Sequence, residues 1–582
     1  MSFYNTLKDD INVIIKNSFL KNTYKKEVYD MFQVSEPPID KFGDVSTNVA
    51  LTLSKILKIN PKVFAVNFLK EVKKLNYIKD AKVEGPGFIN LSLKKDFWLN
   101  ELKQVLSEND KYGESDIGKS KKVIIEFVSS NPTGPLHIGH CRGAVYGDVL
   151  SNIMIKTGFD VYKEFYINNT GSQIDKLTNT VIYRYEELFN KKKVAIDKNL
   201  YPGEYLIELA KDLKKKYGTK FVENNKKDLD SIRNFSLKWI VNLIKSDLNS
   251  LGVHFDCFFS EEELLKKNKV SASIDFLKKK KLVYQGIPTK PKSGDMTEWE
   301  PRKQFLFKST NFGDDVDRTL QKSNGEYTYF AKDIAYHFDK FQRGFKIMIN
   351  VWGADHGGYI KRLSSAVKAI TKDKANLVVK ICQLVKIIDN KKILKMSKRE
   401  GKFISLRRVL NNVGKDVTRF IMLLRKNNED IDFDLQKITE ESKDNPVFYV
   451  QYAHARCCSV LREARKYFVP KEITLTKIKK NNLRNLNDKN EILLIKEIVK
   501  WPKVLEDAVY HYEPHRITFF LQSLASKFHS FWNYGKRDPS KRFINVNNKD
   551  LTFSRLSLIY SVRIILSNGL NLLGVKPLDV MK

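Results

Sequence analysis

The N-terminal part of the chain carries apolar residues at helical spacing, interrupted by one strand-like stretch. Apolar positions three and four residues apart predict helices over residues 3 to about 29, 44–57 and 61–75. Residues 77–93 alternate instead between apolar and polar side chains around Gly85-Pro86-Gly87, which predicts a hairpin. Together these elements predict a small α+β unit at the start of the chain.

The next part of the chain has the pattern of a parallel sheet. After the polar stretch 107–122, the short apolar run 123–128 is typical of a buried parallel strand. A helical pattern follows over 136–157 and a second strand pattern over 161–167. Strand, helix and strand in this order predict the start of a doubly wound α/β sheet, with a domain boundary in the polar stretch.

The remaining chain adds an insertion, two further strands and a helical end. Residues 173–324 are charged and helical in spacing, with no comparable apolar strand before Tyr327, and are therefore expected to form an insertion. Buried strands are predicted over 346–352 and 378–388. From Pro446 onward the pattern is almost wholly helical, which predicts a helical bundle.

The balance of charge favours a polyanionic partner. The chain has 103 basic and 68 acidic residues, a formal net charge of +35. A surface field of that sign attracts RNA or DNA. The alternative is a compositional background of lysine, because runs such as 191–193 and 278–281 are typical of solvated faces. Both explanations remain open at this point.

The spacing of the cysteines and the lengths of the apolar stretches disfavour three classes of protein: those held together by structural zinc, those with disulfides and those that span a membrane. None of the five cysteines belongs to a Cys-x-x-Cys or Cys/His pair of zinc-ligand spacing, so neither structural zinc nor an oxidising compartment is indicated. No apolar stretch reaches the roughly 18 residues of a membrane span. Charged Lys8, Asp9 and Asp10 stand where a signal peptide needs apolar residues. The chain is therefore expected to be soluble and cytoplasmic.

Residues 126–142, EFVSSNPTGPLHIGHCR, lie where the first predicted strand of the sheet gives way to a helix, the ligand-binding end of an open α/β sheet. His137 and His140 share a face of the first helical turn, beside unpaired backbone donors suited to phosphate. Gly139 between them leaves room for a flat base against the backbone. A single histidine at a helix start is more often a cap or a surface residue, but the double histidine is too specific for that interpretation.

Residues 393–403, ILKMSKREGKF, form a second candidate segment, in which Lys395 and Lys398 flank Ser397. Alone, the segment is typical of a solvated basic loop. Together with the histidine pair, it is interpreted as a mobile arm. Its ammonium groups would reach the β- and γ-phosphates of a nucleotide and neutralise charge as pyrophosphate leaves.

These two segments resemble the signature motifs of class I aminoacyl-tRNA synthetases. His137-Ile138-Gly139-His140 is similar to the first motif and Lys395-Met396-Ser397-Lys398-Arg399 to the second. SSNPTGPL at 129–136 narrows the resemblance to the arginyl-tRNA synthetase family. Further passages similar to that family are GDVSTN at 43–48, GPGFIN at 85–90, WGADH at 352–356 and YAHAR at 452–456.

The resemblance implies a Rossmann-type catalytic domain with a mainly helical insertion, an N-terminal α+β domain and a C-terminal all-α helical bundle. The expected boundaries are 1–110 for a tRNA-binding N-terminal domain, 118–445 for the catalytic domain with its insertion at about 173–324, and 446–582 for an anticodon-binding domain. In the bundle, Tyr452, Phe528 and Trp532 are expected to be exposed aromatics that stack on unpaired bases.

Recognition of arginine requires carboxylates for a planar, cationic guanidinium group. The resemblance implies that Glu126, Asn131, Tyr329 and Asp333 hold arginine. The spacing agrees, because Glu126 leaves its strand five residues before Asn131. Tyr329 and Asp333 are four residues apart and share a helical face. Judged without the family, Glu126 could be a surface acid at a strand end and Asp333 one of several charges on a helix.

The resemblance also implies which residues hold ATP and stabilise charge. The expected catalytic residues are His137, His140, Lys395 and Lys398. Nucleotide contacts are expected from His137, Gly139, His140, Gly353, Asp355, His356, Lys395, Ser397 and Lys398. Mg²⁺ is expected to bridge phosphate oxygens, and no side chain is expected to be a metal ligand. The second motif is complete, so Lys398 keeps its role, and Cys141 is given no function.

The implied reaction forms arginyl-adenylate and pyrophosphate from arginine and ATP, and then transfers arginine to the terminal adenosine of its tRNA. The family needs bound tRNA before it activates arginine. The expected partners are tRNA(Arg), L-arginine and ATP, with no membrane, and a cytoplasmic monomer is expected. The alternatives are a nucleic-acid-binding protein with a vestigial nucleotide site, a small-molecule nucleotidylyltransferase and a class I synthetase for another amino acid.

Overall fold

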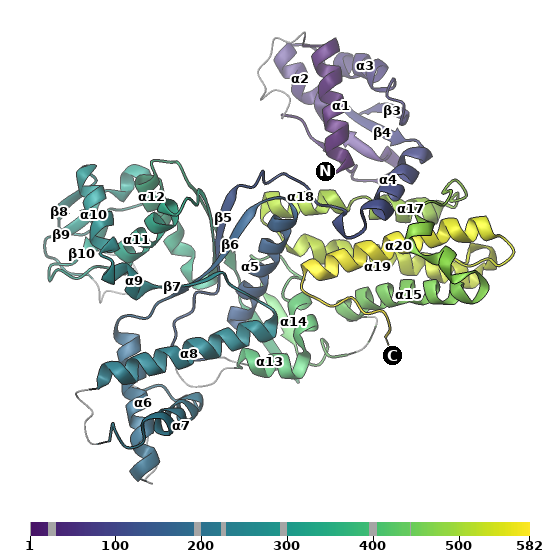
Figure 1. Cartoon of the computed structure of the whole chain (residues 1–582). Coiled ribbons are helices and arrows are strands. Elements are labelled where there is room, and N and C mark those ends of the chain that lie inside the picture. The colour runs from purple at the N-terminus through teal and green to yellow at the C-terminus, as the bar shows by residue number, and fades with distance from the viewer. Residues whose placement is uncertain are drawn as a thin grey trace.

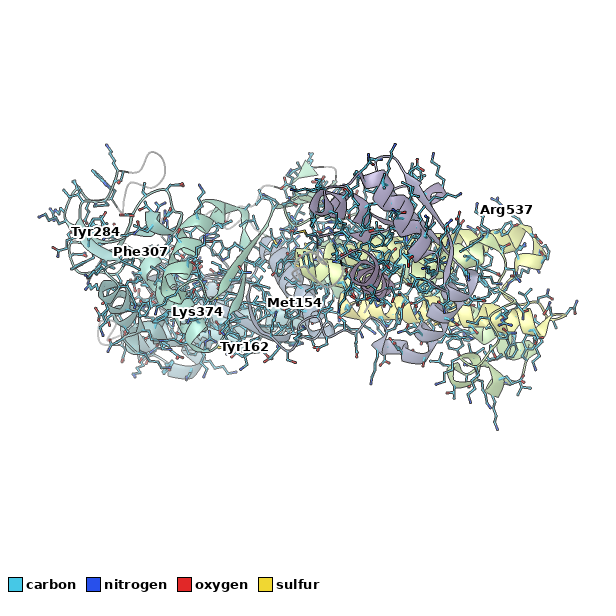
Figure 2. The ribbon with its side chains drawn as sticks, turned by 90° about the horizontal axis from the view of Figure 1, so that it is seen from above. Met154, Tyr162, Tyr284, Phe307, Lys374 and Arg537 are labelled. Carbon is cyan, nitrogen blue, oxygen red and sulfur yellow. The ribbon has the colours of Figure 1, made fainter. Side chains whose placement is uncertain are left out.

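The computed structural model describes residues 2–20, 31–190, 200–222, 228–290, 299–390, 392–394, 404–440, 442 and 444–581. The molecule is elongated, with a parallel sheet near its middle, a helical bundle toward one end and an N-terminal unit resting on the bundle (Figure 1). Seen from above, Tyr284 and Phe307 lie at one end of the molecule and Arg537 at the other (Figure 2). None of the helices among these residues is long and apolar enough to cross a membrane.

The N-terminal unit is a four-stranded antiparallel sheet packed against helices, with strand order β1-β2-β4-β3. Its strands are β1 (Val34–Ser35), β2 (Val45–Thr47), β3 (Ile78–Glu84) and β4 (Phe88–Leu93), and its helices are α1 (Phe3–Ser18), α2 (Val49–Leu57) and α3 (Pro61–Val72). The predicted hairpin is confirmed as β3 and β4. The helix predicted over 44–57 is wrong in its first part, because β2 pairs with β4 and buries alternate side chains.

The first predicted helix is α1, which ends at Ser18. Residues 21–30, the end of that prediction, lie outside the described residues. The third predicted helix is confirmed as α3, where Pro61 occupies the first helical position and the Asn60 side chain accepts from the Lys62 amide. The structure therefore confirms the α+β character that the local sequence pattern predicts for this unit.

The centre of the molecule is a five-stranded parallel sheet of order β12-β11-β5-β6-β7. Its strands are β5 (Lys122–Glu126), β6 (Asp160–Ile167), β7 (Cys257–Ser260), β11 (Ile347–Gly353) and β12 (Asn376–Cys382), and α5 (Ile138–Lys156) connects β5 to β6. From β5 the chain continues to β6 on one side and returns later as β11 on the other. Ligands bind at the carboxyl ends of the strands at such a reversal, so the site is expected where β5 and β11 end.

The expected insertion is helical in its first half but contains strands that the sequence pattern did not reveal. Its helices are α6 (Ser172–Asn190), α7 (Tyr205–Tyr217), α8 (Leu229–Leu251), α9 (Glu261–Lys266) and α10 (Lys269–Lys279). The expectation that no strand precedes Tyr327 is wrong. The strand β7 joins the core sheet. A small antiparallel sheet is formed by β8 (Val283–Gly286), β9 (Gln304–Phe307) and β10 (Arg318–Gln321). These strands have four residues each, too short for a clear period.

The apolar run 378–388 is two strands rather than one. Its first part belongs to β12 in the core sheet, and its second part is β13 (Val385–Asp389) of a separate sheet of order β14-β13-β15. The outer strands of that sheet are β14 (Lys392–Ile393) and β15 (Ile431–Asp434). The chain turns between the two strands, where the Gln383 amide donates to the Asn427 carbonyl at 2.8 Å.

The C-terminal part of the chain is a helical bundle, as the sequence predicts. Its main helices are α15 (Pro446–Tyr467), α17 (Lys489–Ile498), α18 (Trp501–His511), α19 (His515–Arg537) and α20 (Lys549–Leu572). The helix α20 is buried along most of its length and lies against α15 and α19. Two short helices, α13 (Leu406–Val413) and α14 (Lys415–Ile421), connect the core to the bundle.

The start of the chain contacts the helical bundle where the N-terminal unit rests on α18. Glu506 accepts from the Ser2 amide at 2.8 Å, the Ser2 hydroxyl at 2.6 Å and the Asn5 side chain at 2.9 Å. On the neighbouring turn Lys500 contacts Glu36 at 2.5 Å, and on α17 Lys496 pairs with Asp44. The N-terminal unit is therefore fastened to the bundle by polar contacts between residues more than 450 positions apart.

Candidate active site

The histidine pair begins α5 at the carboxyl end of β5. His137 is the N-cap: its Nδ1 accepts from the Gly139 amide at 3.1 Å, while its own amide donates to His140 Nδ1 at 3.3 Å. The two rings stack with centroids 3.9 Å apart. Both histidines therefore cap the helix. The interpretation that the pair is too specific to be a helix cap is wrong.

Capping also fixes the chemistry that the two rings offer. Because each Nδ1 accepts a backbone hydrogen bond, a neutral ring carries its proton on Nε2. Gly139 permits this arrangement, since a Cβ at that position would lie 2.9 Å from the His137 Cε1 atom. The pair therefore presents N–H donors at a helix N-terminus, the combination that suits phosphate oxygens.

The turn before the histidines is braced by a residue that the sequence analysis did not select. Tyr205 on α7 donates to the Thr133 carbonyl at 2.6 Å. A Cβ at Gly134 would lie 2.8 Å from the Tyr205 hydroxyl oxygen, so only glycine fits beneath the ring. Tyr205 lies more than 70 positions along the chain, and no local motif could have indicated it.

The lysine segment is tied to the histidine pair at its C-terminal end. Lys395, Ser397 and Lys398 lie outside the described residues. The first described residues after them pair with the first motif: Ser405 forms a β-bridge with His137, and the Leu406 amide donates to the Leu136 carbonyl at 2.8 Å. Lys398 precedes Ser405 by seven residues, a chain length of at most about 25 Å. The residues that follow the second motif are therefore anchored beside the α5 N-terminus.

Glu126 is buried at the end of β5, and its carboxylate has partners. Its Oε2 accepts from Lys340 Nζ at 2.7 Å and its Oε1 from the Ser129 hydroxyl at 3.0 Å. Lys340 is fully buried on α11 (Tyr329–Gln342) and also donates to Asn350 Oδ1 at 3.3 Å. No local pattern indicates this internal lysine, which already balances the charge of Glu126.

Tyr329 and Asp333 lie on the first turns of α11, as their spacing predicts. Tyr329 is half exposed, whereas Asp333 is only partly accessible and accepts from the Tyr359 hydroxyl at 2.5 Å. Burial, together with the nearby carboxylates of Glu126 and Glu261, raises the pKa of Asp333 to about 7. Asp333 is therefore a carboxyl group whose negative charge needs a cationic partner.

Glu261 is a site residue that the sequence analysis missed. It follows β7 directly, is buried, and accepts from Tyr166 at 2.9 Å, from Lys332 at 2.8 Å and from the Thr170 hydroxyl. The signal that could have found it is its place as the first acid after a core strand, but β7 itself was not recognised. Its carboxylate belongs to the same electrostatic group as Asp333.

The charges of this cluster do not cancel. Three carboxyl groups, Glu126, Asp333 and Glu261, face two lysines, Lys332 and Lys340. When Asp333 is ionised, the sum over these five groups is one negative charge. A buried uncompensated charge is unfavourable, so the cluster is electrostatically completed by one bound cation.

The remaining predicted residues lie at the same edge of the sheet but are exposed. Asn131 donates to Gln173 Oε1 at 2.9 Å. Gly353, Asp355 and His356 follow β11, the strand paired with β5, and His356 Nε2 lies 3.5 Å from Asp355 Oδ2. The structure thus brings all the described candidates to the carboxyl ends of β5, β7 and β11, where a ligand is expected.

A second candidate surface lies on the helical bundle. Arg456 stacks between two aromatic rings, with its Cζ atom 4.1 Å from the Tyr452 centroid and 5.1 Å from the Trp532 centroid. Beside them is a cavity of about 410 Å³ between α15, α19 and residues 542–544. The Trp532 Nε1 donor is buried and lacks a hydrogen-bond partner among the residues described. The prediction for Phe528 is wrong, because its ring is fully buried in the core of the bundle.

Comparison with known proteins covers nearly the whole chain. Three family models match: the arginyl tRNA synthetase N-terminal domain at residues 5–93, the catalytic domain of class I (R) tRNA synthetases at 101–458, and the DALR anticodon binding domain at 450–581. An arginine–tRNA ligase of Azorhizobium caulinodans is 45% identical over 94% of both chains, one of Wolbachia pipientis wMel is 47% identical over 94% of both, and one of Rickettsia bellii is 44% identical over the full length of both.

Solved structures share the fold at lower sequence identity. The chain superposes on the arginyl-tRNA synthetase of Thermus thermophilus with a TM-score of 0.72 and 20% identity, covering 99% of this chain and 100% of the other. The arginyl-tRNA synthetase of Plasmodium falciparum gives a TM-score of 0.71 and 18% identity over 100% of this chain and 99% of the other.

Proposed function

The chain belongs to the arginyl-tRNA synthetase family of class I aminoacyl-tRNA synthetases, and we propose which of its residues bind arginine, ATP and tRNA. The enzyme activates arginine with ATP and transfers it to tRNA. Its Rossmann-type core, α+β N-terminal unit and C-terminal bundle are the architecture that the reaction uses. The single observation that carries the arginine assignment is the uncompensated charge of the Glu126, Asp333 and Glu261 cluster.

The guanidinium group of arginine is the cation that completes this cluster. Asp333 is the carboxylate with a raised pKa, and Tyr359 holds one of its oxygens in place. Glu261 is bonded to Lys332, and Glu126 to Lys340, so both act mainly by setting the charge and shape of the pocket. Tyr329 and Asn131 stand at the exposed rim, where they contact the arginine. A neutral side chain of the same shape would leave the cluster negative and bind less well.

In adenylate formation the protein forms no covalent bond to the substrates. It aligns the attacking carboxylate with the α-phosphorus and stabilises the negative charge of the phosphates. The arginine carboxylate attacks the α-phosphorus, and pyrophosphate leaves. His137 and His140 hold the triphosphate through Nε2–H donors, while Gly139 leaves room for the His137 ring that caps α5. Lys395 and Lys398 neutralise the departing pyrophosphate, with Ser397 between them. Magnesium enters as part of the substrate, bridging phosphate oxygens.

The nucleotide also meets the end of β11. Gly353, Asp355 and His356 lie beside the strand that pairs with β5, so they can contact the part of ATP that extends away from the histidines. Two buried polar atoms have no hydrogen-bond partner in the described part of the chain: the Ser130 hydroxyl and Asn168 Oδ1. Both follow core strands, and a substrate that donates hydrogen bonds would satisfy them.

The tRNA is held by the N-terminal domain and the helical bundle, which lie side by side (Figure 1). The N-terminal domain, residues 1–110, contacts the outer corner of the tRNA, and the bundle, residues 446–582, binds the anticodon. The cavity beside Trp532 fits an unstacked base, since it offers aromatic and guanidinium surfaces and a buried donor. We place the enzyme in the cytoplasm, as family membership implies, and as a monomer, since one chain carries both the catalytic cluster and the base-binding cavity and no second chain is needed to complete either.

Amino-acid specificity is tested by ATP–pyrophosphate exchange with each amino acid in turn, with and without tRNA(Arg). We expect exchange with arginine, and only when tRNA(Arg) is present. Exchange driven by another amino acid would contradict the arginine assignment. Arginine-dependent exchange without tRNA would contradict the expected requirement for tRNA while leaving the assignment of the pocket intact.

Changing the anticodon bases of tRNA(Arg) is expected to lower kcat/KM about 10- to 100-fold, because loss of one stacked base contact removes about 1–3 kcal/mol. Aminoacylation kinetics measure the effect, with a tRNA altered in an anticodon-stem base pair as the matched control. The Trp532→Ala variant should reduce the penalty of the changed anticodon, since the lost contact is then absent in both tRNAs. An anticodon replaceable without effect would show that the bundle does not read it.

A further inference from the structure

A cluster of potential metal ligands lies on the bundle, away from the active site. His454 and Cys458 are four residues apart on one face of α15, and Asp579 belongs to the C-terminal segment after α20. That segment returns along α15, as Figure 1 shows. The three ligand atoms, His454 Nδ1, Cys458 Sγ and an Asp579 carboxylate oxygen, all lie within 4.8 Å of one another.

We propose that His454, Cys458 and Asp579 form a binding site for a divalent transition metal ion of the zinc type, which fastens the C-terminal segment to α15. The proposal does not depend on the reaction proposed above. It was not visible in the sequence because Asp579 lies 121 positions beyond Cys458, so no ligand spacing of a zinc motif is present.

The distances between the ligand atoms fit a tetrahedral metal ion. Cys458 Sγ lies 3.3 Å from Asp579 Oδ1 and 3.9 Å from His454 Nδ1, and Nδ1 lies 4.0 Å from Oδ1. Ligands bound at the usual zinc distances are about 3.3–3.6 Å apart. The observed triangle therefore needs to contract by only about half an ångström, which the side chain of exposed Asp579 can supply.

The ion would replace hydrogen atoms that now hold the cluster together. Without metal, the Cys458 thiol donates to Asp579, and His454 Nδ1 lies 2.9 Å from the Leu578 carbonyl. On binding, the thiol proton is released to solvent and the imidazole proton moves from Nδ1 to Nε2. One thiolate, one carboxylate and one divalent ion then sum to zero charge. The Leu578 carbonyl or a water supplies the fourth ligand.

The surroundings of the cluster influence the two protonation states that metal binding requires. Burial lowers the pKa of His454, so the imidazole is neutral at physiological pH, as a ligand must be. Burial and Asp579 raise the pKa of Cys458 to about 11, against the opposing effect of Arg563 and Arg462. The two guanidinium groups repel a free cation but favour the thiolate once it forms.

The donor set selects among metals. One nitrogen, one sulfur and one oxygen ligand suit Zn²⁺ or Co²⁺, whereas Mg²⁺ requires oxygen ligands in octahedral geometry. Binding of a metal to the folded chain alone also raises its thermal stability by mass action. Zn²⁺ is therefore expected to raise Tm, and Mg²⁺ at the same concentration to have no such effect through this site.

The test is titration of the full-length, chelator-treated chain with Co²⁺. We expect one equivalent to bind per chain, with a thiolate-to-cobalt charge-transfer absorption that Zn²⁺ removes by competition. Cys458→Ser should abolish this absorption, and Asp579→Asn, an exposed change, should weaken Co²⁺ binding about 10- to 100-fold. The matched control is Cys257→Ser, which removes a partly exposed thiol outside the cluster and should change nothing.

Three results would overturn the proposal: no charge-transfer absorption in the unmodified chain, the same absorption in Cys458→Ser, or its loss in Cys257→Ser. If Cys458→Ser does not fold, Asp579→Asn decides the matter. Unchanged Co²⁺ affinity in that variant would also contradict the proposal, since Asp579 is the ligand that joins the C-terminal segment to α15.

Discussion

Replacing Lys398 by alanine is expected to slow the formation of arginyl-adenylate about 10²- to 10³-fold, the usual effect of removing one group that stabilises charge in the transition state. In the proposed mechanism its ammonium group acts mainly as negative charge moves onto the departing pyrophosphate. Arginine affinity should therefore hardly change, and the loss should appear in the rate of the chemical step. Single-turnover measurement of adenylate formation, at saturating ATP, arginine and tRNA, separates the two effects.

Lys402→Ala is the matched control, because it removes the same charge from the same basic segment outside the second motif. We expect its single-turnover rate to stay within about threefold of the unmodified enzyme, as for a solvated surface charge. Equal rates for Lys398→Ala and the unmodified enzyme would remove Lys398 from the mechanism. Equal losses in both variants would instead indicate a general effect of the segment's charge.

Replacing Asp333 by asparagine is expected to weaken arginine binding about 10- to 100-fold, since a hydrogen bond to a charged partner contributes about 1.5–3 kcal/mol. The shape of the pocket is kept, and the cluster of Glu126, Glu261 and the two lysines becomes neutral. ATP affinity should hardly change. Calorimetry with arginine and with citrulline, its neutral analogue, measures the loss: discrimination between the two should fall with the charge.

The pH dependence of the same site gives an independent test. A carboxyl group with a pKa of about 7 is mostly protonated at pH 6 and mostly ionised at pH 8. Arginine affinity of the free enzyme should therefore rise about tenfold between pH 6 and pH 8. Asp333→Asn should flatten this profile, whereas Asp315→Asn, which removes an exposed carboxylate paired with Lys361, should leave it unchanged. Loss of ATP binding with intact arginine binding would refute the assignment.

Local patterns predicted where the residues of the strand-to-helix turn lie, whereas contacts between residues far apart in the chain could not be predicted from them. The strand-to-helix turn at 126–142 is a continuous stretch whose geometry follows from its own residues, so the position of His137 and His140 at the sheet edge could be anticipated. The contact of Glu126 with a buried lysine could not. Its partner Lys340 lies 214 positions away on α11, and nothing in either local sequence indicates that the two meet.

Short strands account for most of the errors in the fold. The strand β7 has four partly buried residues and no period of its own, because its place is fixed by pairing with β6. Missing it also meant missing Glu261, the acid that follows it. Phe528 shows the same limit in the bundle, because helical spacing places it on a face but the packing of α19 decides whether that face is covered.

The contacts that join Ser2 and Asn5 to Glu506 have a consequence for biosynthesis. At a translation rate of about 5–20 residues per second, roughly 25 to 100 s pass between the emergence of the first residues and of α18. The N-terminal sheet has its own hairpin and can fold during that interval, but its docking surface does not yet exist. Docking of the N-terminal unit onto the bundle is therefore a late event in synthesis, and a ribosome stalled before α18 would carry a folded but undocked N-terminal unit.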